Sequence, residues 1–176
     1  MKAKELVHKD VLDLFEGVSY KYDSCPLIDS LSKIFTEGIN CELFVHIILE
    51  LFFLSSLPKW LRAKEMYEDD NFVKDVTDGF YQAGDVFFFS PRENINPMYF
   101  HLAIMVGQNE EGVPMLAHAS NYMNGSNDAV RIWPLNYFLQ QKKYKFLQAV
   151  KRVRINPKYS SIAEEEQYNA HCYASC

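Results

Sequence analysis

The sequence lacks the signatures of several protein classes. Its 176 residues contain four cysteines, namely Cys25, Cys41, Cys172 and Cys176. They are too few for a disulfide framework, which favours a reducing compartment. The first residues mix charges and lack the apolar core of a signal peptide. The longest apolar run, residues 43–54, is interrupted by His46 and Glu50 and is too short to span a bilayer. We therefore expect a cytoplasmic protein without a membrane span, with export by a specialised secretion route as the open alternative.

An excess of positive charge is also absent. The net charge of −5 argues against a nucleic-acid binder. The one cationic concentration, residues 142–154, alternates with apolar residues and predicts the solvated face of a strand rather than a phosphate-binding patch. His171 with Cys172 and Cys176 is better explained as a frayed terminus than as part of a metal site. We expect no metal and no organic cofactor.

The chain shows no repeats, linkers or low-complexity segments, which predicts one domain over residues 1–156 and a mobile tail over 157–176. Apolar spacing predicts a helix over 4–15 ended by Gly17, a short helix over 27–35, a buried helix over 41–54, and a helix with a loop over 60–78. Strand-like runs follow at 86–89, 102–106, 115–117, 130–133 and 146–155, with a hairpin loop at 108–112 and a short helix at 134–141. Helices first and a meandering antiparallel sheet second predict an α+β domain.

Cys41 lies where a thiol is favoured as a nucleophile. The turn at residues 38–40 leads directly into the apolar helix that Cys41 begins. A helix N-terminus presents unpaired backbone N–H groups and the positive end of the helix dipole, which both favour the thiolate. We therefore predict a nucleophile rather than a structural cysteine. Cys25, which precedes Pro26 in a loop, is predicted to be structural.

Two histidines follow on strand-like runs. His101 begins a strand after a proline-containing loop, and His118 ends the next strand of the predicted hairpin, so both imidazoles are expected on one face of the sheet. That arrangement supplies a base and a partner that orients it. His46 lies about 140° around the helix from Cys41 and is predicted to be structural. His8 and His171 are expected at the surface.

The order of these segments resembles the NlpC/P60 cysteine peptidases, papain-like hydrolases that cleave cell-wall peptides. The resemblance covers roughly residues 14–154 and rests on the runs 17–20, 40–45, 84–89, 101–107, 117–120 and 130–135. It implies a papain-like α+β fold in which the nucleophile lies on a central buried helix packed on an antiparallel sheet. It also implies that Cys41 is the nucleophile, His101 the base and His118 the group that orients His101.

The resemblance further places Tyr20 near the oxyanion and the substrate amine, and it makes Asn40 a second candidate for contact with the substrate. The family's Asp-Cys-Ser-Gly run is replaced here by Asn40, Cys41, Glu42 and Leu43. In the family the aspartate contacts the free amine of the peptide. The neutral Asn40 therefore weakens the expectation of a substrate with a free N-terminal L-alanine.

The expected function is a cysteine-dependent peptidase or amidase that hydrolyses an amide bond in a cell-wall peptide. A peptide or muropeptide is then the expected partner. Two alternatives remain open: the same three residues act as a deamidase or acyltransferase on a protein or lipid, or the chain is a catalytically silent peptide-binding module. The sequence makes no prediction of the oligomeric state.

Overall fold

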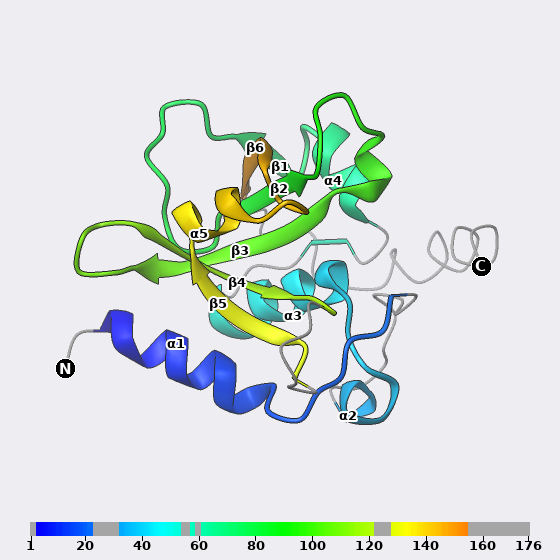
Figure 1. The fold of residues 1–176 in the computed structure, drawn as a ribbon, viewed down its shortest axis with the longest axis vertical. Helices are drawn as coiled ribbons and strands as arrows, with labels where there is room; N and C mark the ends of the chain where they lie inside the picture. The colour runs from blue at the N-terminus through cyan, green and yellow to red at the C-terminus, as the bar shows by residue number, and fades with distance from the viewer. Residues whose placement is uncertain (1–2, 23–31, 54–56, 59–60, 122–127, 155–176) are drawn as a thin grey trace.

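A computed structural model describes residues 3–22, 32–53, 57–58, 61–121 and 128–154 (Figure 1). Its helices are α1 (Ala3–Leu14), α2 (Lys33–Glu37), α3 (Cys41–Phe53), α4 (Ala63–Glu68) and α5 (Leu135–Gln140), with a 3₁₀ helix η1 (Pro97–Tyr99). Its strands are β1 (Val73–Asp75), β2 (Val86–Ser90), β3 (His101–Gln108), β4 (Pro114–Ala119), β5 (Val130–Pro134) and β6 (Phe146–Val153). They form one antiparallel sheet in the order β1-β6-β2-β3-β4-β5. The predicted α+β class is confirmed.

Both faces of the sheet are covered. Along β2, Val86 and Phe88 belong to a core shared with α1 and α3, whereas Phe87 and Phe89 belong to a second core shared with α5. Figure 1 shows α3 behind the sheet and α5 in front of it. Because both faces are buried, the central strands are apolar throughout rather than alternating with polar residues.

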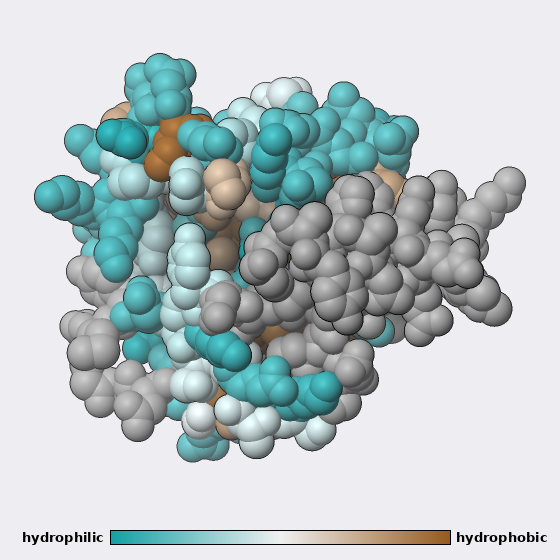
Figure 2. Space-filling view, turned by 90° about the vertical axis from the view of Figure 1, so that its right-hand side faces the viewer, coloured by the Kyte–Doolittle hydropathy of each residue, from teal (hydrophilic) through white to brown (hydrophobic). Residues whose placement is uncertain are grey.

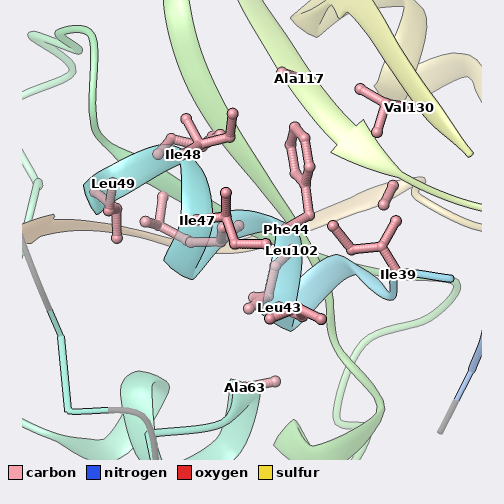
Figure 3. Packing of buried hydrophobic residues seen from close by; sticks show 14 of the residues in the cluster. Ile39, Leu43, Phe44, Ile47, Ile48, Leu49, Ala63, Leu102, Ala117 and Val130 are labelled. Carbon is pink, nitrogen blue, oxygen red and sulfur yellow. The ribbon is translucent and has the colours of Figure 1, made fainter. Parts of the chain in front are cut away.

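α3 is the central helix of the larger core. Residues 42–49 are all buried, and the helix packs on β3 and β4. Figure 3 shows Phe44 pointing from α3 toward Ala117 of β4. The ring of Phe44 also meets that of Phe15 at 5.1 Å, which joins α3 to the end of α1. Burying a phenylalanine side chain contributes about 1.5–3 kcal/mol, so these contacts fix the position of the helix firmly.

The segment over 60–78 differs from its prediction. It holds α4, but residues 73–75 form the edge strand β1, which pairs with β6. Only Val73 of this strand is buried, so the sequence carries no strand pattern there. In the predicted helix 27–35, residues 27–31 lie outside the described residues, and α2 begins at Lys33. Cys25, His171, Cys172, Cys176 and the predicted tail also lie outside them.

The cationic segment is only partly a solvated face: Lys142, Lys143 and Lys145 are exposed, but two cations of β6 are paired with carboxylates. Lys151 is buried and pairs with Asp75 of β1 at 3.0 Å, and Arg152 pairs with the buried Asp85 at 2.7 Å. Both partners come from other segments, which sequence spacing does not reveal. His8 is likewise only partly exposed, and its Nε2 is buried without a hydrogen-bond partner among the described residues, contrary to the expected surface position.

The surface of the protein is more polar than its two cores. The face seen in Figure 2 is mostly hydrophilic, with hydrophobic side chains in small separate areas. Among the described helices, none has the length and apolar character needed to cross a membrane.

Candidate active site

A short pairing of backbone brings Tyr20 to the start of α3. The Ile39 N–H donates to Ser19 O at 2.9 Å, and the Lys21 N–H donates to Ile39 O at 3.1 Å. Gly38 makes this approach possible because its φ is +83° and a Cβ there would lie 2.9 Å from Ser19 O. Tyr20 therefore lies beside the residues that lead into Cys41.

Asn40 caps α3. Its Oδ1 accepts the Leu43 N–H at 2.8 Å, and its Nδ2 donates to Tyr22 O at 3.3 Å. The residue is 3% exposed. An asparagine cap stabilises a helix by about 1 kcal/mol relative to alanine. The structure thus gives Asn40 a structural task, and its predicted contact with substrate stays a prediction.

Cys41 is the first residue of α3 and remains partly exposed. Burial, together with the charge of Glu42, raises the pKa of its thiol to about 12. Backbone hydrogen bonds from Leu102, Cys41 and Glu42 lower the pKa, which is the effect predicted for a helix N-terminus, but burial outweighs them. The direction of this shift is opposite to the predicted preference for thiolate. The contact with Leu102 places the sulfur against β3, next to His101.

Glu42 joins α3 to α4. Its Oε2 accepts from Arg62 Nε and its Oε1 from the Ala63 N–H, each at 3.0 Å. Both carboxylate oxygens are thus engaged at the N-terminus of α4. The carboxylate of Glu42 is thus buried and paired at the residue next to the thiol.

The two predicted histidines meet, which confirms that they are neighbours. His101 Nε2 lies 2.8 Å from His118 Nδ1, and the rings are almost perpendicular at 89°. Burial lowers the pKa of His101 to about 3, and the charge of Lys143 adds to this. The pKa of His118 also lies well below its ordinary value because of burial, then of the charges of His101 and Arg131. Both imidazoles are therefore neutral at pH 7.

The surroundings of His118 assign the tautomers of this pair. Its Nε2 is buried without a hydrogen-bond partner among the described residues, and the rings of Trp133 and Phe138 lie 4.6 and 4.7 Å from its own. Contact of an aromatic ring with an N–H donor is more favourable than its contact with the lone pair of a ring nitrogen. We therefore place the proton on His118 Nε2, so that His118 Nδ1 accepts from His101 Nε2–H. His101 Nδ1 then keeps a lone pair and is able to act as a base.

Two tyrosines complete the site. Burial, followed by the charge of Cys41, raises the pKa of Tyr20, so its hydroxyl stays protonated near the sulfur. Tyr144 is buried and stacks on His101, with ring centroids 4.4 Å apart and an interplanar angle of 27°. Tyr144 was missed by the sequence analysis because it lies in the loop between α5 and β6, with no motif around it.

Other residues of the predicted motifs are structural. Asp85 is fully buried, pairs with Arg152 and accepts the Gln82 N–H at 2.9 Å. His46 donates from Nε2 to Leu61 O at 2.8 Å, which agrees with its predicted structural role. Among the described residues, no group of three or more histidine, cysteine or acidic side chains could hold a metal ion.

Comparison with known proteins supports the fold. No protein-family model matches the chain, and no curated protein matches it significantly. A solved structure from Staphylococcus aureus subsp. aureus Mu50, described as similar to a lipoprotein of the NLP/P60 family, matches with a TM-score of 0.52 and 19% identity. The match covers 89% of this chain and 43% of that one. At this identity the likeness concerns the fold, and it agrees with the NlpC/P60-like architecture expected from the sequence.

Proposed function

We propose that this chain is a cysteine-dependent amidase or peptidase in which Cys41 attacks a carbonyl carbon and His101 transfers the proton. The observation that carries the proposal is the meeting of three distant segments. The thiol at the start of α3 contacts the backbone of Leu102, the residue after His101, and Tyr20 lies close enough for the charge of Cys41 to act on its hydroxyl. His101 is in turn held by His118 at 2.8 Å.

The protonation states suggest how the attack proceeds. Since the thiol and both imidazoles are neutral at rest, the proton moves from Cys41 to His101 Nδ1 while the sulfur–carbon bond forms. Negative charge then develops on the carbonyl oxygen rather than on the sulfur. The Tyr20 hydroxyl and the Cys41 backbone N–H are the donors that we assign to this oxyanion, and removing one such donor typically costs about 100- to 1000-fold in rate.

The second half of the reaction uses the same groups. His101 returns its proton to the leaving amine, which breaks the amide C–N bond and leaves a thioester on Cys41. Water then attacks the thioester while His101 accepts a proton, and the proton passes to the departing sulfur as the acid product leaves. His118 keeps the His101 ring oriented through both steps.

A cell-wall peptide is the substrate class that we infer. It rests on the sequence resemblance and on the NLP/P60 description of the structural neighbour. In the first turn of α3 the only carboxylate is that of Glu42, and both its oxygens bind the start of α4. We therefore expect an internal or capped amide rather than one that needs a free N-terminal amine.

Acyl transfer is the second candidate function. The burial that lowers the pKa of both histidines and raises that of the thiol also limits the access of water to a thioester on Cys41. A thioester protected in this way favours an amine or hydroxyl acceptor over water.

The test uses a muropeptide panel with free and acetylated N-termini, with products identified by mass spectrometry. Wild type is expected to form a cleaved product and an acyl adduct on Cys41, whereas Cys41→Ala forms neither. His46→Gln is the matched control, since it alters a buried histidine of the same helix outside the site. Glycinamide added as an acceptor separates transfer from hydrolysis. Equal turnover by wild type and Cys41→Ala contradicts the proposal.

A further inference from the structure

Tyr144 covers the histidine pair from a loop that belongs to neither histidine strand. Its N–H donates to Gln141 O at 3.0 Å, which forms the turn between α5 and β6. The side chain returns over the sheet and is 5% exposed. Its ring lies nearly parallel to His101 and perpendicular to His118, at 27° and 87°. One tyrosine therefore contacts both imidazoles, each in a different orientation.

The tyrosine is also fixed at its hydroxyl. Tyr144 Oη lies 3.0 Å from the buried Ser120 Oγ, and Ser120 follows His118 by two residues. The Ser120 N–H donates to Ala129 O at 2.9 Å, which anchors that position to the residue before β5. The ring cannot slide along His101 without breaking the bond to Ser120.

We propose that Tyr144 is a positioning residue that holds the His101 imidazole in the orientation needed for proton transfer with Cys41. His118 engages Nε2 of His101 and Tyr144 covers one face of its ring, so two of the directions in which the ring could turn are blocked. The position of His101 Nδ1 is thereby fixed. This inference rests on the proposed function of His101 as the base.

Several charged or titratable groups face the pair and bear on its protonation. Lys143 precedes Tyr144 and acts on His101, and Arg131 of β5 acts on His118. Cys41, the proposed nucleophile, and Tyr20 are the further titratable groups of this site. Both cations disfavour a charged imidazole, as does the shielding of His101 from water by the tyrosine ring. Removal of the ring is therefore expected to admit water and to let His101 turn.

The experiment combines NMR titration of His101 with steady-state kinetics. In Tyr144→Leu the pKa of His101 is expected to rise toward its ordinary value of 6.5. kcat is expected to fall by about 10- to 100-fold, with little change in KM. Tyr144→Phe keeps the stacked ring and is expected to retain the low pKa and most of kcat. Tyr81→Leu is the matched control, because Tyr81 packs on Phe87 in the same core layer.

A measurement on the wild type keeps the inference testable if Tyr144→Leu does not fold. Stacking at 4.4 Å is expected to shift the carbon-bound protons of the His101 ring upfield. Unshifted His101 resonances overturn the inference. So does a Tyr144→Leu protein that is folded and keeps both the pKa and kcat of wild type. The NMR results need no substrate, so they fail or succeed independently of whether the chain hydrolyses the peptides tested.

Discussion

The raised pKa of the thiol leads to a testable prediction: Cys41 should react slowly with alkylating reagents in the resting protein. With a pKa of about 12, only about one Cys41 in 10⁵ is thiolate at pH 7, against about 3% for a thiol with an ordinary pKa of roughly 8.5. A more basic thiolate is intrinsically more nucleophilic, which recovers about 25- to 55-fold. The net expectation is labelling about 100-fold slower than for an ordinary thiol.

The assay is iodoacetamide labelling read by mass spectrometry of the peptide that contains Cys41. The same chain unfolded in urea provides the ordinary thiol in an identical sequence context. In the folded protein the rate is expected to rise about tenfold per pH unit from pH 7 to 10 without a plateau, because the pKa lies above that range. Glu42→Gln removes a charge that raises the pKa and is expected to accelerate labelling by roughly three- to tenfold.

A preformed thiolate–imidazolium pair would behave differently. It would label rapidly at pH 5–6, reach a plateau below pH 8, and lose its low-pH reactivity in His101→Ala. Any of these results refutes the neutral pair and the concerted proton transfer derived from it. The expected result is that His101→Ala leaves the low-pH labelling rate unchanged, since the thiol is protonated with or without the imidazole.

Four further predictions concern catalysis and stability. Cys41→Ala and His101→Ala should abolish turnover of a muropeptide while the far-UV circular dichroism stays unchanged, and His118→Ala should leave weak activity because it only orients the base. Asn40→Asp should improve the ratio of kcat/KM for free over acetylated peptides by about 10- to 100-fold, the worth of a charge-assisted hydrogen bond of about 1.5–3 kcal/mol; a strong free-amine preference already present in wild type would contradict the reasoning. Arg152→Met leaves the buried Asp85 charge without its bidentate partner and should cost about 3–5 kcal/mol in urea unfolding, whereas a loss below about 1 kcal/mol would show that the pair is not buried in solution. Because the pKa of His101 is lowered on folding, its contribution to the free energy of unfolding is fully present above pH 6.5 and is lost as the pH falls toward about 3. Protonation of this one group should lower the free energy of unfolding by about 2 kcal/mol between pH 7 and 5. His101→Gln should reduce that pH dependence.

Much of the fold follows from local sequence pattern. The apolar run after Cys41 predicted a buried helix, and α3 begins at that residue. The strand-like runs correspond to β2 through β6, since a strand buried on one or both faces needs apolar residues whatever it packs against. β1 was missed because an exposed edge strand of three residues is defined by its pairing with β6 rather than by its own residues.

Part of the candidate site could likewise be predicted from the sequence, and part could not. The sequence pattern named Cys41, His101 and His118, because a helix start and two strand ends are visible along the chain, and the family resemblance added Tyr20 and Asn40. Only the tertiary structure showed the 2.8 Å contact of the histidines, the stacked Tyr144 and the surroundings that raise the pKa of the thiol. The pKa of the thiol shifts in the direction opposite to the one predicted, because a helix N-terminus is a local property, whereas the burial that raises the pKa is produced by segments far apart in the chain.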